Sequence, residues 1–318
     1  ARKEQLAPLD DADLIAELGV NEGGFTELSE VGIKALAKIE SGEPLVTGKL
    51  EQNAFPKLNE LAPVHKGELV IIGAQTSLGK TAFAVKLSTG LISMGAKGIY
   101  LPYEGSYESL LYRTISQECK IPLDQVRANK IPEDKMPDVR NWIASIHDTH
   151  VGLSDNVGNV TSIFSRVRER KATKKALDFV IIDHMHLMEL EKSGIREGFI
   201  DVTKKLIRIA KNEDVLIIVL TQFRKLTGDE KNEKPHGELI RESATICQDA
   251  HQVWLLHDPE FRKPTTESDP FDHNGSPIRS GTEPDPAEII VEKNREGKVG
   301  SIEARFIRSY GLWTEIKQ

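Results

Sequence analysis

Short apolar runs alternate with amphipathic stretches along most of the chain. The runs consist mainly of Val, Ile, Leu and other apolar residues, which is typical of strands buried on both faces of a sheet. Between them, apolar residues recur every three or four positions, which predicts helices. We expect strands over residues 68–73, 98–103, 151–153, 177–183 and 215–221, and helices over residues 81–94, 106–119, 134–147, 160–171 and 200–211. This alternation predicts an α/β fold with a mostly parallel sheet covered on both faces.

The order of elements changes after the last of these strands. Three further strand-like runs have no long helical pattern between them, so we expect an antiparallel extension of the sheet. They cover residues 251–256, 287–292 and 301–307. Two polar stretches, residues 225–237 and 258–286, are predicted to be exposed loops, and the second is rich in Pro, Asp, Ser and Gly.

The first 45 residues differ from the rest of the chain. Residues 1–24 are polar and predict a tail, whereas residues 26–40 carry a mostly one-sided apolar stripe that predicts a helix beginning at Thr26. We therefore expect an N-terminal tail and helix over residues 1–45 and one α/β domain over residues 46–318. The chain begins without Met, so we expect a fragment or a processed product.

Composition excludes several classes of protein. Hydrophobic residues make up 39% and charged residues 29% of the chain, which is ordinary for a globular protein. No apolar run approaches the ~18 residues that span a bilayer, and no apolar stretch follows the basic N-terminal residues as in a secretory signal. The two cysteines are far apart and predict reduced thiols. We therefore expect a cytoplasmic protein with no membrane partner. The net charge of −7 argues against a protein that coats nucleic acid through overall basicity, but it leaves room for a local basic loop.

A phosphate-binding loop follows the first predicted strand of the sheet. The pattern G-x-x-x-x-G-K-[ST] requires a glycine at the first position, where this chain has alanine preceded by Gly73, but the Gly-Lys-Thr core is intact. Backbone amides of such a loop face phosphates, the lysine neutralises the β- and γ-phosphates, and the threonine hydroxyl binds Mg²⁺. We expect a site for ATP or another nucleoside triphosphate with Mg²⁺ formed by Ala74, Gln75, Thr76, Ser77, Leu78, Gly79, Lys80 and Thr81.

Polar residues end three other strands. Asp183 follows a buried apolar run, and in a fold with a phosphate loop such an aspartate holds Mg²⁺. Glu104 ends the strand over residues 98–103, and we expect it to polarise the attacking water from a strand next to that of the phosphate loop. Gln222 is expected to contact the γ-phosphate. His184 and His186 would share one face of a strand, but two ligands are a weak indication of a metal site.

These pieces together resemble the ring-forming replicative DNA helicases of the bacterial DnaB type, whose ATPase domain has a RecA-like fold. The likeness covers roughly residues 25–318 and includes the Arg-Glu-Ser and Lys-x-Arg patterns in the C-terminal part of the chain. The family also accepts alanine at the first position of the phosphate loop, where this chain has Ala74. The matching segments are residues 74–81, 103–104, 181–183, 220–222, 239–244 with 248–250, and 289–297.

The resemblance implies roles for further residues. Arg295 would be an arginine finger acting on the nucleotide of a neighbouring subunit, with Lys293 beside it. Arg241, Glu242 and Ala244 would approach the phosphates of single-stranded DNA. The family further implies a hexameric ring, 5′→3′ movement that unwinds duplex DNA, and a primase or helicase loader as partner. The helix over residues 26–40 is similar to the family's linker helix.

The sequence also departs from the family in several places. Histidines follow Asp183 where the family commonly has Tyr-Leu-Gln, and Ala244 stands where the family has Gly. The family's N-terminal helical domain is not matched, which puts helicase loading and primase contact in question. Two other functions stay open. A different RecA-fold ATPase, such as a strand-exchange recombinase or another ring ATPase, would show helical filaments or DNA-independent turnover, and a nucleotide-gated assembly module would bind ATP without turnover.

Overall fold

A computed structural model of the chain describes residues 36–37, 39–41, 48–103, 105–146, 151–153, 158–173, 176–190, 194–224, 233–240, 244–259 and 283–316. Its strands are β1 (Lys49–Leu50), β2 (Val64–His65), β3 (Leu69–Ala74), β4 (Gly98–Pro102), β5 (Val151–Leu153), β6 (Phe179–Asp183), β7 (Leu216–Gln222), β8 (Gln252–His257), β9 (Asp285–Asn294), β10 (Gly300–Ile307) and β11 (Leu312–Glu315). The α-helices are α3 (Pro56–Leu61), α4 (Lys80–Ser93), α5 (Tyr107–Cys119), α6 (Leu123–Arg127), α7 (Met136–Ser145), α8 (Val160–Ala172), α9 (Ile195–Asn212) and α10 (Ala244–Asp249).

Nine strands form one sheet in the order β11-β10-β9-β8-β3-β7-β6-β4-β5, and β1 and β2 form a separate pair. The pairs from β8 through β3, β7, β6 and β4 to β5 are parallel, whereas β9, β10 and β11 are antiparallel. The predicted parallel sheet with an antiparallel extension is therefore confirmed. The prediction was wrong for β8, which runs parallel to β3 because the chain, after α10, enters β8 at the edge of the sheet where β3 begins.

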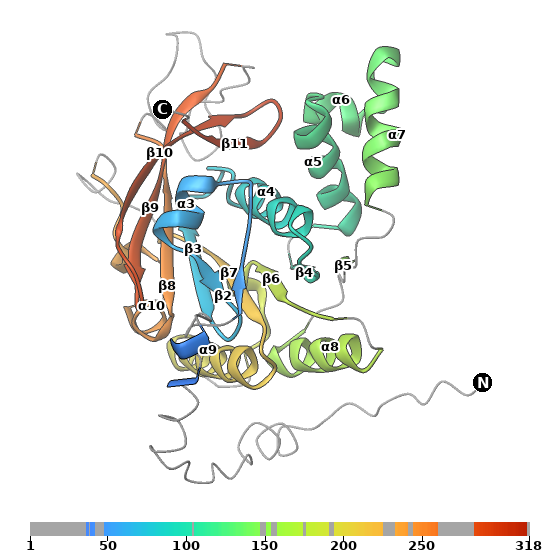
Figure 1. Cartoon of the computed structure of the whole chain (residues 1–318). Helices are drawn as coiled ribbons and strands as arrows, with labels where there is room; N and C mark the ends of the chain where they lie inside the picture. Colours follow the sequence, from blue (N-terminus) through green and yellow to red (C-terminus); the bar gives the residue numbers. More distant parts are fainter. Residues whose placement is uncertain are drawn as a thin grey trace.

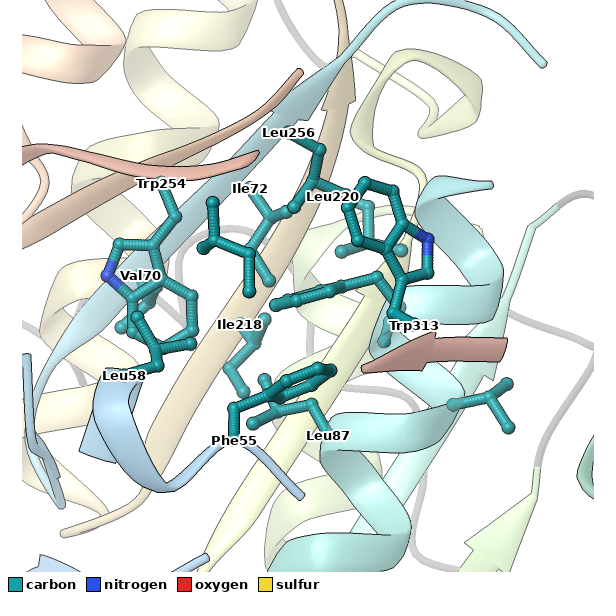
Figure 2. Close-up of a cluster of buried hydrophobic side chains, with 14 of the residues drawn as sticks. Phe55, Leu58, Val70, Ile72, Leu87, Ile218, Leu220, Trp254, Leu256 and Trp313 are labelled. Carbon is teal, nitrogen blue, oxygen red and sulfur yellow. The ribbon is translucent and has the colours of Figure 1, made fainter. Parts of the chain in front are cut away.

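The sheet separates two hydrophobic cores, as the alternation of side chains along a strand requires. Val70 and Ile72 of β3 face α3 and α4, together with aromatic residues of β8 and β11, whereas Leu69 and Ile71 face α8 and α9. Figure 1 shows α8 and α9 on one side of the sheet and α3 and α4 on the other. Figure 2 shows part of the first core, with Val70, Ile72, Ile218 and Leu220 between Trp254 and Trp313. Both faces of the central strands are thus buried.

The helices follow the predicted pattern with local differences. The helix expected over residues 134–147 begins as a 3-10 turn (Glu133–Lys135) and continues as α7, which has a proline at its start. A third cluster, centred on Ile115 and Val139, packs α5 against α6 and α7. The sequence reasoning missed the short elements α3, α6, α10 and β11. Within the predicted N-terminal helix, the described residues among 36–41 are helical, and the rest of it lies outside the described residues.

The base of the long loop predicted over residues 258–286 is held by one arginine. Arg308, in the turn after β10, donates from its guanidinium to Asp258, with 2.9 Å between the paired atoms, and to Asp285 at 2.5 Å. Asp258 is buried, and the guanidinium also lies 5.4 Å above the ring centroid of Phe306. Asp285 already belongs to β9, so the strand begins inside the predicted loop, most of which lies outside the described residues.

Candidate functional site

The phosphate loop lies at the carboxyl end of β3 and leads directly into α4. Gly79 is the N-cap of α4 with a φ of +84°, a left-handed conformation that glycine adopts without strain, and as a glycine it provides no capping side chain. The first amides of a helix lack partners within the helix. The amides at the start of α4 therefore point in the direction from which an anion would approach, and the helix dipole favours negative charge there.

Lys80 and Thr81 occupy the first turn of α4, and Lys80 is buried. The charge of Lys80 is felt by His184, which is also buried and follows β6. Burial above all, followed by Lys80 and His186, lowers the pKa of His184 to about 4. At neutral pH the imidazole beside Lys80 is therefore uncharged, and Lys80 supplies the positive charge at this edge of the sheet.

Asp183 ends β6 and is buried, 3% exposed, at the same edge of the sheet. The hydroxyl of Tyr100 in β4 donates to its Oδ2 at 2.9 Å, and the backbone amide of Tyr103 donates to its carbonyl oxygen at 2.6 Å. Burial, then the charge of Asp183, raises the pKa of Tyr100 well above its usual value, so the phenol stays a donor. Tyr100 therefore fixes one carboxylate oxygen, a contact that the sequence reasoning missed because it joins two strands.

Gln222 ends β7, the immediate neighbour of β3, and pairs in register with Ala74 of the phosphate loop. The next residue, Phe223, donates its amide to the Ala74 carbonyl oxygen at 3.0 Å and forms an antiparallel bridge with Ile240. A methyl group on Gly73 would come within 2.9 Å of the Phe223 ring and 3.0 Å of Ile240. The end of β7 and the start of the predicted DNA-contacting segment therefore pack directly on the phosphate loop.

Arg295 and Lys293 lie at the opposite edge of the sheet. The amide of Arg295 donates to the carbonyl oxygen of His251, whose own amide donates to Leu69 at the amino end of β3, with nitrogen–oxygen distances of 3.0 and 2.9 Å. The six residues of β3 span roughly 20 Å at about 3.3 Å each. Arg295 therefore cannot reach the phosphate loop of its own chain.

Carbonyl oxygens at the end of α10 accept from both of these cationic side chains. Arg295 Nη2 donates to the carbonyl oxygen of Asp249 at 2.8 Å, and Lys293 Nζ donates to those of Cys247 and Ala250 at 3.0 and 2.8 Å. Positive charge is favourable at a helix C-terminus. Burial, then Arg295, lowers the pKa of Lys293. Within the single chain these residues thus hold α10 against β9, next to the predicted DNA-contacting segment.

Several predicted site residues lie outside the described part of the chain. Glu104, Arg241 and Glu242 are among them, and Ala244 is described only as the first residue of α10. The expectation that β4 lies next to β3 was wrong, because β7 and β6 stand between them in the sheet. Glu104 follows the end of a strand three places from β3.

The two histidines after Asp183 do not form the predicted strand pair. The strand ends at Asp183, and His186 lies in a 3-10 turn (Met185–Leu187), with the two ring centroids 5.8 Å apart. Among the described residues, no group of three or more His, Cys, Asp or Glu side chains is placed to hold a metal ion. The oxygen ligands available at this edge, the Thr81 hydroxyl and the Asp183 carboxylate, are the kind that Mg²⁺ prefers. The donor set therefore fits Mg²⁺ bound together with phosphates.

Two aromatic residues support the phosphate loop and were missed by the sequence reasoning. Trp313 Nε1 donates to the carbonyl oxygen of Gly79 at 3.1 Å, and the Phe306 ring lies 2.5 Å from the position that a Cβ on Gly79 would occupy. Both come from the hairpin of β10 and β11 at the far end of the chain. The sequence held no local signal for either contact.

Comparisons with known proteins agree with this geometry. The family model of the DnaB-like helicase C terminal domain matches residues 52–315. A probable replicative DNA helicase of Trieres chinensis is 25% identical over 279 residues, covering 86% of this chain and 58% of that protein. The replicative DNA helicase DnaC of Bacillus subtilis is 23% identical over 307 residues, covering 94% and 64%. The replicative DNA helicase DnaB of Rickettsia typhi is 28% identical over 312 residues, covering 91% and 61%.

Solved structures support the fold. One solved ATPase domain superposes with a TM-score of 0.77 at 22% identity, covering 92% of this chain and 100% of that one. A DnaB-like replicative helicase, studied with its primase interactions, superposes with a TM-score of 0.76 at 22% identity, covering 92% and 69%. The fold is RecA-like, as predicted. This chain spans about three fifths of the length of the curated relatives named above, 58–64%. No described helix is long and apolar enough to cross a membrane.

Proposed function

The chain belongs to the DnaB-like helicase C terminal domain family, and we propose that it hydrolyses ATP or another nucleoside triphosphate to move along single-stranded DNA and separate duplex DNA. One observation carries the proposal. The phosphate loop, Asp183 and Gln222 share one edge of the sheet, whereas Arg295 lies at the other. Such a chain needs a second copy to bring a finger to each nucleotide.

Nucleotide binding is assigned to the phosphate loop. The amides of the first turn of α4 and the Lys80 ammonium would bind the phosphate oxygens, and Thr81 and Asp183 would hold Mg²⁺, directly or through its water. A bound Mg²⁺ would neutralise negative charge between the β- and γ-phosphates. The Tyr100 hydroxyl holds one oxygen of the Asp183 carboxylate in place. Because the carboxylate is planar, this contact also fixes the direction of its other oxygen. We assign Glu104 to polarise the attacking water.

A ring is proposed because the finger and the loop lie at opposite edges of one sheet. In a closed ring each subunit presents its loop edge to one neighbour and its Arg295 edge to the other. An arginine that arrives from outside supplies positive charge to the transition state only when the interface closes. Hydrolysis is thereby coupled to movement between subunits. The hexameric state is taken from the family.

DNA contact is assigned to the segment that contains Arg241, Glu242 and Ala244. Its start is tied to the nucleotide site, because Ile240 bridges to Phe223 at the end of β7 and Leu239 accepts a hydrogen bond from the Arg224 amide at 2.7 Å. A change at Gln222 on loss of the γ-phosphate therefore reaches the segment through two or three residues. Affinity for DNA should be sequence-tolerant and fall with salt.

The partners and location follow from the proposed role. A helicase in replication meets a primase and a helicase loader, and the printed description of one structural neighbour names interactions with primase. We propose both as partners of the whole protein to which this chain corresponds. Bacterial or phage DNA is replicated in the cytoplasm, so the protein is placed there.

Steady-state ATP hydrolysis with and without single-stranded DNA tests the proposal. Stimulation by DNA, with a specific activity that rises with protein concentration, is expected if sites are completed between subunits. Lys80→Ala should abolish turnover because it removes the phosphate counter-charge. Lys86→Ala is the matched control, because that lysine lies on the same helix but pairs with Glu118 at 2.8 Å.

Three outcomes would contradict the proposal in different ways. Wild-type turnover by Lys80→Ala would refute the phosphate-loop assignment. A rate indifferent to DNA and concentration, or helical filaments in electron micrographs, would favour another RecA-fold ATPase. Nucleotide binding without turnover, even with DNA, would favour an assembly module.

A further inference from the structure

The hairpin of β10 and β11 contacts the phosphate loop at Gly79, the residue that precedes α4. Trp313 Nε1 donates to the Gly79 carbonyl oxygen at 3.1 Å, and the same oxygen accepts the first helical hydrogen bond of α4, from the Phe83 amide at 2.9 Å. The oxygen therefore has two donors, one for each lone pair. The bond from the Phe83 amide is of the kind found in every α-helix, whereas the bond from Trp313 comes from a side chain 234 residues away.

Fixing this oxygen also fixes an amide of the phosphate site. The Gly79 carbonyl and the Lys80 amide belong to one planar trans peptide, in which the C=O and N–H bonds point in opposite directions. With the oxygen held toward Trp313 and Phe83, the Lys80 amide is directed away from them, toward the side of the loop that receives an anion. We propose that Trp313 is a positioning residue for phosphate binding, acting through the Gly79–Lys80 peptide.

The indole itself is held in one place. Its ring stacks on Phe306, with centroids 5.2 Å apart and planes at 30°, and meets Phe83 edge-on at 5.8 Å and 89°. Trp313 is fully buried. Beside it, the buried Gln117 amide donates to the carbonyl oxygens of Ala82 in α4, at 2.9 Å, and of residue 311 in the hairpin, at 2.6 Å. The hairpin and the start of α4 are therefore joined at two points, and the indole N–H cannot turn elsewhere.

A conservative pair of variants tests this role, which rests on the proposed nucleotide site. Trp313→Phe keeps an aromatic ring in the stack but removes the N–H donor. Trp254→Phe makes the same change in the same core, where the indole donates to Gln252 at 3.0 Å and not to the loop. Figure 2 shows the two tryptophans on opposite sides of this cluster. The dissociation constant of MgADP and the urea unfolding midpoint are measured for both variants and the wild type.

The two variants should differ in affinity but not in stability. Trp313→Phe is expected to raise the MgADP dissociation constant about three- to tenfold, the effect of one net hydrogen bond, and Trp254→Phe to leave it unchanged, while both lower the unfolding midpoint similarly. Equal dissociation constants for the two variants would overturn the inference while leaving the nucleotide site intact. No MgADP binding by the wild type would overturn both the inference and the proposed function.

A measurement on the unaltered protein guards against a variant that fails to fold. Wild-type protein with isotopically labelled tryptophans gives separate indole N–H signals in NMR spectra. The signal that is missing from the spectrum of each variant identifies the corresponding tryptophan. MgADP should shift the Trp313 signal and slow its hydrogen exchange, with the Trp254 signal unchanged. A Trp313 signal that is indifferent to MgADP, in a protein that binds it, would refute the positioning role.

Discussion

Gly79→Ala should destabilise the protein more than an alanine at any other described glycine with a positive φ, and the structure gives the magnitude. The new Cβ would lie 2.5 Å from Cζ of Phe306, whereas ordinary contact begins at 3.4 Å, so the ring would need to move by about 1 Å. Phe306 is buried and stacked on Trp313, so the movement disturbs the hairpin. Overpacking of this kind costs about 1–3 kcal/mol, and the left-handed backbone adds about 1–2 kcal/mol.

Gly95→Ala is the matched control at the other end of α4. Gly95 has a φ of +91°, close to that of Gly79, but nothing lies within 4 Å of its Cβ position. Its substitution should cost only the backbone strain, about 1–2 kcal/mol. Urea unfolding should therefore place Gly79→Ala about 1–3 kcal/mol below Gly95→Ala, with weakened MgADP binding in the first variant only.

A second substitution separates the two causes. Phe306→Leu in the Gly79→Ala background should recover part of the loss, so the two changes would not be additive. If Gly79→Ala costs no more than Gly95→Ala, or if Phe306→Leu recovers nothing, the ring does not restrict the loop. The reasoning that the hairpin shapes the phosphate site would then be refuted.

Arg295→Ala should abolish ATP hydrolysis and leave MgADP binding unchanged, and a loss of binding in titration calorimetry would show that it acts within its own subunit. Burial and, to a smaller extent, the charge of Arg295 lower the pKa of His251 below 6.5. Nδ1 of His251 accepts a hydrogen bond from the Leu69 amide at 3.1 Å. The unfolded chain therefore takes up the proton first, and stability falls as the pH drops below 6.5. His251→Asn should flatten this decline in urea unfolding, and an unchanged slope would contradict the assignment. Arg308→Met should lower the unfolding free energy by about 3 kcal/mol because two paired carboxylates lose their partner. Lys135→Ala, in an exposed pair, should cost below about 1 kcal/mol in the same assay, and equal losses would refute the difference.

The sequence by itself determined the local features of this protein. The apolar runs predicted the central strands, because alternation and helical periodicity are properties of neighbouring residues. The Gly-Lys-Thr core predicted the strand, loop and helix of the phosphate site, since the whole motif lies within one short segment. Asp183 and Gln222 were placed correctly at strand ends for the same reason.

Only the tertiary structure decided which strands are neighbours and what supports the site. The residues of β4 and β8 do not indicate where the connecting segments return the chain, so the place of β4 in the sheet and the direction of β8 were predicted wrongly. The contact of Trp313 with Gly79 joins residues 234 positions apart, beyond any local pattern. The placement of Arg295 at the edge opposite the phosphate loop likewise depends on the tertiary structure. Arg295 follows β9, and the local sequence does not indicate in which direction that strand runs in the sheet.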